Sequence, residues 1–185
     1  MQESSLIALA VPPTLAVVRA IPADRLDAPT PCGDWTVQDL VDHQLQWGPA
    51  LVAAARKELL TPDPVSKGAP VDLERHFAAL TAAWSEPAAW TGVTRLGGPM
   101  ELPAAMIGGM VLGEVVVHGW DLAVATGQRP EWPAEVLECT HEEVAKTAEQ
   151  GRAMHVYGPA VAVPDDAPLL DRILGLTGRD PKWRP

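Results

Sequence analysis

The chain has 185 residues, of which 47% are hydrophobic and 21% are charged, proportions typical of a globular protein with a buried core. A formal net charge of −10 with only 14 Lys and Arg argues against nucleic acid or an anionic membrane as a partner, because both need a basic surface. Cys32 and Cys139 are too few for a disulfide scaffold or a four-thiolate zinc site. We therefore expect one cytoplasmic domain, residues 1–185, with a small molecule as its partner.

Helical periodicity and terminal signals predict a mostly all-α fold with five main helices. Pro12 and Pro13 suit the first turn of a helix, where proline leaves no hydrogen bond unmade. The following segment IPADRLDAPTPCGDW is rich in Pro, Asp and Gly, which predicts a loop. Thr36, with Asp39 three positions later, resembles a capping box that begins the second helix. The expected helices cover residues 12–20, 36–60, 71–84, 103–127 and 133–151.

Two less regular regions accompany these helices. Gly97 and Gly98 lie between short apolar stretches at residues 91–102, which predicts a small β-hairpin. From about Arg152 the chain is rich in Pro, and only residues 166–176, DAPLLDRILGL, show helical spacing of Leu and Ile. We expect this C-terminal tail to form one short helix and to pack against the main helices.

The longest apolar segment, roughly residues 103–126, contains the most informative polar residues. It is long enough to cross a bilayer, but Glu114, His118 and Asp121 lie within it, so we interpret it as a buried helix. No Lys or Arg occurs from residue 96 to residue 128, so Glu114 has no cation nearby in the sequence. Burying an unpaired carboxylate is costly, and something must therefore compensate its charge.

A divalent metal ion is one such compensation. Glu114 and His118 are four positions apart, which places both side chains on one face of a helix. His43, in the apolar context LVDHQLQW, is the best third ligand from a facing helix. The spacing alone is weak, because Asp72 and His76 share it. A buried hydrogen-bonded pair is therefore an equal alternative for Glu114 and His118, and His43 alone favours a structural role.

These motifs resemble a known family. TPCGDWTVQDLVDHQ, followed at a distance by GEVVVHGWDLAVATG and the closing PDDAPLLDRILGLTGRDP, is similar to the metal-binding domain of mycothiol-dependent maleylpyruvate isomerases and their stand-alone relatives. The resemblance implies a four-helix bundle of the DinB-like superfamily. It also implies a divalent metal held by a His on the second helix and a Glu-x-x-x-His pair on a later one. Those positions match His43, Glu114 and His118.

The resemblance implies the site more directly than the reaction. The isomerase has an additional C-terminal domain that contributes to its active site, whereas about 35 residues follow the last main helix here. Relatives use mycothiol or another low-molecular-weight thiol, whose pKa the metal lowers. The resemblance thus implies a metal-dependent thiol transferase or isomerase acting on a small electrophile. Zinc suits two nitrogens and one carboxylate best, but nickel, iron and manganese accept similar ligands.

Other polar and aromatic residues have two interpretations each. Asp121 either accepts a hydrogen bond from a ligating His or caps a neighbouring loop. Three tryptophans either line a pocket or, more commonly, belong to the core: Trp35, Trp47 and Trp120. Cys32 and Cys139 have no neighbouring His in the sequence and are expected to be ordinary thiols. The remaining histidines are expected at the solvated surface: His76, His141 and His155.

Two further functions stay open at this point. A module that binds metal or a small ligand without turnover fits the lack of a second catalytic group in the sequence, and catalytic residues are unassigned. A purely structural polar network, for example at a homodimer interface, is the third interpretation, since helical bundles often pair. The substrate is not specified by the sequence, because pocket loops determine it.

Overall fold

The computed structural model describes residues 3–63 and 67–185, and most of them are helical. The α-helices are α1 (Leu6–Arg19), α2 (Val37–Ala55), α3 (Asp72–Trp84), α4 (Ala104–Ala125), α5 (Ala134–Ala153) and α6 (Leu169–Leu176). The other elements are the 3₁₀ turns η1 (Glu3–Ser5), η2 (Ala23–Arg25) and η3 (Pro87–Trp90) and the strands β1 (Val93–Arg95) and β2 (Glu101–Pro103). The predicted mostly helical fold with a small antiparallel hairpin is therefore confirmed.

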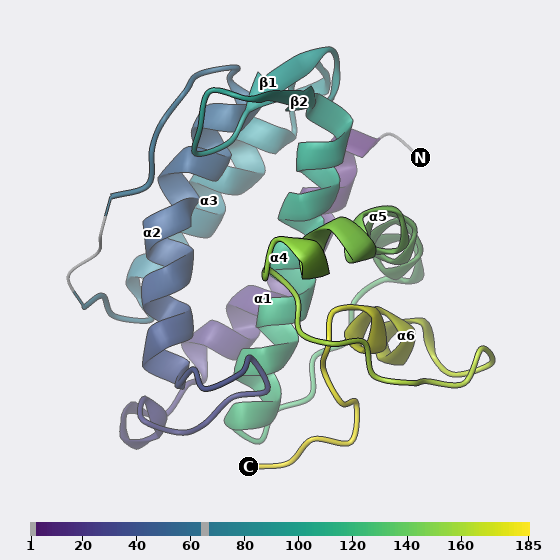
Figure 1. Ribbon diagram of the computed structural model, residues 1–185. Coiled ribbons are helices and arrows are strands. Elements are labelled where there is room, and N and C mark those ends of the chain that lie inside the picture. The colour runs from purple at the N-terminus through teal and green to yellow at the C-terminus, as the bar shows by residue number, and fades with distance from the viewer. Residues whose placement is uncertain (1–2, 64–66) are drawn as a thin grey trace.

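The first four α-helices form a bundle (Figure 1). Helix α1 packs against α3 and α4, and α2 packs against the same two helices, so their apolar faces enclose one core. The hairpin lies at one end of this bundle, while α5 covers an outer side of α4 and α6 packs on α5. The C-terminal tail thus packs on the bundle, as expected, and it reaches α4 from the side opposite α2.

Helix α1 begins earlier than predicted. It starts at Leu6, and Pro12 and Pro13 lie inside it instead of in its first turn. Proline within a helix removes backbone hydrogen bonds, so a proline pair is more typical of a helix start. Burial of the preceding apolar turn outweighs that loss, since Leu6, Ile7 and Ala10 are almost completely buried.

Helix α2 begins where predicted but ends at Ala55, before the expected residue 60. Lys57 adopts a left-handed conformation with φ of 63°, and the N–H of Glu58 donates to the carbonyl of Ala53 at 2.9 Å. This pattern terminates a helix, usually with glycine at the left-handed position. The Lys57 ammonium donates to the carbonyl of Ala89 at 2.7 Å, which ties the turn to η3 and favours the unusual conformation.

Helix α4 is the central element of the molecule. It is the one helix among the described residues that is long and apolar enough to cross a membrane. Within its most apolar stretch of 18 residues, 83% is buried inside the protein. Gly119 allows α1 to approach closely, because a Cβ there would lie 2.7 Å from the Thr14 hydroxyl oxygen. The interpretation of this segment as a buried core helix is therefore confirmed.

Candidate metal centre

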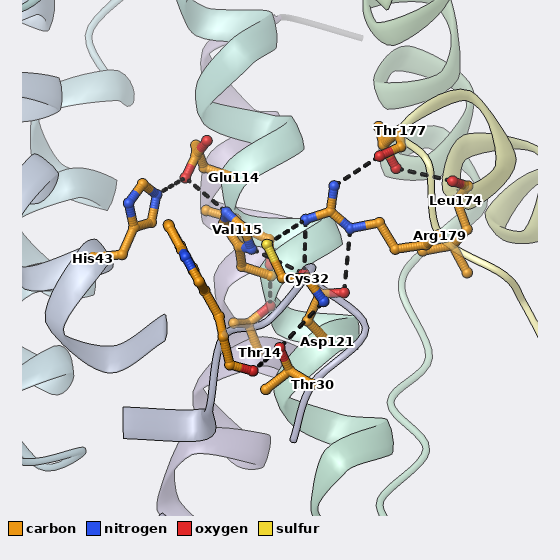
Figure 2. Close-up of polar contacts among 12 residues, drawn as sticks. Thr14, Thr30, Cys32, His43, Glu114, Val115, Asp121, Leu174, Thr177 and Arg179 are labelled. Atoms are coloured by element: carbon orange, nitrogen blue, oxygen red, sulfur yellow. Dashed lines mark hydrogen bonds and ion pairs between the residues drawn. The ribbon is translucent and has the colours of Figure 1, made fainter. Parts of the chain in front are cut away.

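The α2 and α4 helices present the three predicted ligands to one another. A capping box fixes the start of α2, because Thr36 Oγ1 accepts from the N–H of Asp39 and Asp39 Oδ2 accepts from the N–H of Thr36. His43 lies two turns further along that helix. Glu114 and His118 lie one turn apart on α4, and Figure 2 shows Glu114 and His43 facing each other between the helices.

The three side chains converge. His43 Nε2 lies 3.2 Å from Glu114 Oε2, and His118 Nε2 lies 3.5 Å from the same oxygen. One ligand atom from each residue lies within 4.8 Å of the other two. The exposed side-chain fractions are 19% for His43, 31% for Glu114 and 10% for His118, so the cluster opens to solvent on the side of Glu114 and His43.

The spacing of these atoms fits a tetrahedral metal. Ligand atoms bonded at about 2.1 Å to a tetrahedral ion lie roughly 3.4 Å apart, close to both separations found here. A charge-assisted hydrogen bond would bring the atoms to about 2.8 Å, which is shorter than either. Two imidazole nitrogens and a carboxylate oxygen are also the donor set that Zn²⁺ accepts in sites with an open fourth position. The residues present therefore fit such an ion.

Glu114 is held as an anion. Burial by itself would raise the pKa of its carboxyl, but the neighbouring His118 and the hydrogen bond with His43 lower that pKa to about 2. The Arg179 guanidinium, which comes from the C-terminal tail, contributes more weakly. An ionised carboxylate is the protonation state that a metal cation requires of a Glu ligand.

Asp121 orients His118 and is itself neutralised by Arg179. Figure 2 shows the Asp121 and Arg179 side chains facing each other. The Asp121 side chain is fully buried, and its Oδ2 lies 3.0 Å from His118 Nδ1. Arg179 Nη2 donates to the same oxygen at 3.0 Å, and Arg179 Nη1 donates to the Thr177 carbonyl at 2.8 Å. A carboxylate at Nδ1 turns Nε2 of His118 toward Glu114. These contacts match the predicted role of Asp121 as a hydrogen-bond partner of His118 and not that of a loop cap.

Cys32 is close to this network, although no His neighbours it in the sequence. Its Sγ accepts from Arg179 Nη2 at 3.1 Å, and Cys32, His118 and Asp121 form a second set of potential ligand atoms within 4.8 Å of one another. Arg179 already provides the positive charge for this second set. Burial raises the pKa of the Cys32 thiol to about 11, so it is a neutral thiol, as expected for an ordinary cysteine.

The three tryptophans differ in position. Trp120 is buried in the core, as expected. Trp35 is 37% exposed, and its ring centroid lies 4.9 Å from that of His43 and 6.4 Å from that of His118, so it forms a wall of the cluster. Trp47 is half-buried and borders a cavity beside Glu114. The core interpretation is therefore wrong for Trp35 and Trp47.

His76 is not at the solvated surface, in contrast to the expectation. It borders the cavity beside Glu114, and burial lowers the pKa of its imidazole to about 4. The ring packs on the backbone of α2 at Gly48, where a Cβ would lie 2.3 Å from His76 Nδ1. His141 is partly exposed and His155 is exposed. The burial of His76 could have been inferred from its helical spacing to Leu73, Phe77 and Leu80, which are buried.

The tail supplies the residues that sequence reasoning missed most clearly. Arg179 is 5% exposed and contacts both Asp121 and Cys32. Tyr157 packs against Gly151, and burial together with the charge of Glu114 raises the pKa of its phenol to about 12. The absence of Lys and Arg around Asp121 in the sequence was a usable signal, because a buried acid then needs a cation from elsewhere in the chain.

Comparison with known proteins assigns the family. The model of the mycothiol maleylpyruvate isomerase N-terminal domain matches residues 11–123, which include His43, Glu114 and His118. Two uncharacterized proteins of Mycobacterium tuberculosis, from strains CDC 1551 / Oshkosh and ATCC 25618 / H37Rv, are each 29% identical over 122 residues, which is 65% of this chain and 65% of each relative. No solved structure matches the chain significantly. Since the family model covers more than half of the chain, the protein belongs to the mycothiol maleylpyruvate isomerase N-terminal domain family of metal-binding, DinB-like helical domains.

Proposed function

We propose that this protein binds a divalent metal ion, with zinc the best fit, through His43, Glu114 and His118, and that it transfers a low-molecular-weight thiol such as mycothiol to a small electrophile. The observation that carries the proposal is the convergence of two imidazole nitrogens on one carboxylate oxygen at 3.2 and 3.5 Å. Nickel, iron and manganese accept the same donors and are alternatives.

The charges around the cluster support a cation. Glu114 and Asp121 are both acidic, and Arg179 forms its ion pair with Asp121 and not with Glu114. With neutral imidazoles, one negative charge remains uncompensated at Glu114. A divalent ion balances that charge and leaves a positive excess that attracts a thiolate. The proposal therefore explains why an acid is retained in the most apolar helix.

The chain's own residues would prepare the site for a thiol. When bound, the metal would lower the pKa of a thiol at its open position, as zinc does for water. Asp121 would hold the His118 ring so that Nε2 faces the ion, and Trp35 would limit the motion of both rings. Solvent reaches the cluster beside Glu114 and His43, which is the approach open to a thiol and its electrophile.

Substitution of cobalt for the native metal tests the proposal. The cobalt protein is titrated with mycothiol and, separately, with a simple thiol. We expect a sulfur-to-metal charge-transfer band that saturates, and we expect loss of both cobalt and band in His118→Ala. His141→Ala on α5 is the matched control and keeps both.

Each alternative predicts a different result. Bound metal without any spectral response to thiols contradicts the transferase and favours the non-catalytic metal-binding module. Equal metal content in His118→Ala and His141→Ala contradicts the metal centre itself. A response to thiols without consumption of any electrophile indicates a thiol-binding module instead of a transferase.

A further inference from the structure

A second polar group of side chains lies beside Glu114, on the side where α2 faces α3. A cavity there is bordered by Gln44 and Trp47 of α2, His76 of α3 and Glu114 of α4, with apolar side chains completing its wall. Its free volume of about 10 Å³ is roughly the space for one group the size of a water molecule, such as a hydroxyl or the terminal nitrogen of a primary amide.

Gln44 is the most informative residue of this cavity. Its side chain is 6% exposed, and neither Oε1 nor Nε2 has a hydrogen-bond partner among the residues that the structure describes. Buried amide groups in proteins are nearly always hydrogen-bonded, because an unpaired donor or acceptor is costly away from water. A buried carboxamide with both ends unpaired, at the border of a cavity, therefore indicates a bound partner that offers both a donor and an acceptor.

The His76 ring, which forms the wall from α3, packs tightly against α2. Gly48 lies one turn after Gln44 on α2, and a side chain at this position would collide with the His76 ring. The glycine therefore allows His76 to border the same cavity as Gln44 and Glu114. These three polar side chains come from α2, α3 and α4, so the cavity is a product of the bundle and not of a single loop.

The charges of the cavity select its ligand. No Lys or Arg occurs among the residues that border it, so no side chain there would balance the charge of a carboxylate or phosphate. A cation would satisfy Gln44 Oε1 but would face the hydrogens on Nε2. An uncharged group that both donates and accepts, such as a hydroxyl or a primary amide, matches both ends of the carboxamide.

We propose that this cavity is a subsite for one uncharged hydroxyl or primary amide group of the electrophilic co-substrate, held by Gln44 beside the metal centre. The inference rests on the proposed function, because the position next to Glu114 places the rest of such a ligand at the open side of the metal. Small uncharged electrophiles are then preferred over their carboxylate counterparts. Gln44 acts as a specificity-determining residue.

Binding of two nonreactive probes, propionamide and propionate, tests the subsite. They have the same size and shape and differ in charge. Metal-free protein labelled with ¹⁵N is titrated with each probe, so that propionate has no metal to bind, and the Gln44 side-chain amide and Gly48 backbone amide resonances are followed. We expect propionamide to shift both resonances saturably, with at least roughly tenfold tighter binding than propionate.

Two variants assign the effect to Gln44. In Gln44→Leu the side-chain resonance disappears, and propionamide binding, followed at Gly48, weakens roughly tenfold. Gln46→Leu makes the same chemical change on the same helix outside the cavity, and it retains wild-type binding. If Gln44→Leu does not fold, the comparison of propionamide with propionate on the wild-type protein still decides.

The outcomes separate the subsite from the proposed function. Equal binding of both probes, or no shift with either, overturns the subsite and leaves the cavity to solvent. Zinc binding is measured separately on the same preparation. A protein that binds no zinc but still responds to propionamide at Gln44 contradicts the metal centre and supports the subsite.

Discussion

Asp121 connects the cluster of His43, Glu114 and His118 to the rest of the protein, and its substitution is the most direct test of the proposed metal centre at the residue scale. In Asp121→Asn the amide replaces the carboxylate that lies 3.0 Å from His118 Nδ1. Loss of such a partner lowers metal affinity by about 10- to 100-fold. Competition with a zinc chelator measures the change, and Asp165→Asn in the exposed part of the tail serves as the control. Unchanged affinity in Asp121→Asn would show that Asp121 serves only to pair with Arg179.

His76 predicts a specific dependence of stability on pH. Burial lowers the pKa of its imidazole from 6.5 to about 4 in the folded protein. Between these values the unfolded state binds more protons, so stability is complete above pH 6.5 and falls as the pH falls toward 4. A pKa lowered from 6.5 to about 4 corresponds to a loss of about 3 kcal/mol.

Denaturant titrations of the metal-free protein at several pH values measure this effect. We expect His76→Gln to flatten the decline between pH 6.5 and pH 4, while His155→Gln on the exposed turn after α5 leaves it unchanged. Glu114, with its pKa lowered to about 2, acts in a separate window, from pH 4.5 down to pH 2. An identical decline in His76→Gln and wild type would contradict the burial of a neutral His76.

At the scale of elements, the contact between α1 and α4 depends on a glycine. A Cβ at Gly119 would lie 2.7 Å from Thr14 Oγ1 and 3.0 Å from Cζ2 of Trp132, whereas the nearest side-chain atom to a Cβ at Gly113 is Cγ2 of Val144, at 3.9 Å. We expect Gly119→Ala to destabilise the protein by about 1–3 kcal/mol through overpacking. Gly113→Ala on the same helix should be neutral or stabilising by up to about 1 kcal/mol, because alanine favours helix.

Urea denaturation of both variants and of Thr14→Ala combined with Gly119→Ala measures these effects. Removing the Thr14 side-chain oxygen and methyl group relieves the collision, so the double variant should be more stable than the sum of the two single changes predicts. Strict additivity would mean that α1 and α4 do not press on each other at this position.

Some element boundaries could be predicted from the sequence and others could not, for physical reasons. The start of α2 was predicted because a capping box is a local signal in which Thr36 and Asp39 satisfy each other's backbone groups. The end of α2 was not, because the left-handed Lys57 depends on a distant acceptor, the carbonyl of Ala89. The start of α1 was missed because the burial of its first turn, a tertiary effect, outweighs the local cost of Pro12 and Pro13.

At the scale of the whole molecule, the same distinction applies to the site. The i, i+4 spacing and the acid in an apolar helix pointed to Glu114 and His118, the apolar context of His43 made it the best third ligand, and the resemblance favoured a metal over a hydrogen-bonded pair. Gln44 and His76 were missed because their burial depends on how α2 packs against α3. Arg179 was missed because the tail crosses from α6 to α4, and no local pattern specifies that path.

Arg179 and Asp121 form the buried ion pair through which the C-terminal tail reaches the bundle. Their side chains are 6% and 0% exposed, and the closest atoms are 3.0 Å apart. Removing one partner of such a pair leaves a buried charge, which costs about 3–5 kcal/mol. We therefore expect Arg179→Met to destabilise the protein by this amount, while Arg184→Met in the exposed terminus has little effect.

Combining Arg179→Met with Asp121→Asn removes the unpaired charge and should recover at least about 2 kcal/mol of stability relative to Arg179→Met alone. Metal affinity is expected to change in a different pattern. Arg179→Met keeps the Asp121 carboxylate at His118 and removes a positive charge near Glu114, so it should retain or strengthen metal binding, whereas the double variant should weaken it. Denaturant titration measures stability and chelator competition measures metal affinity, both on the wild type, Arg179→Met, Asp121→Asn and the double variant. If Arg179→Met and the double variant lose metal affinity equally, the tail supports the site through packing alone, and the proposed chain of contacts from Arg179 through Asp121 to His118 is wrong.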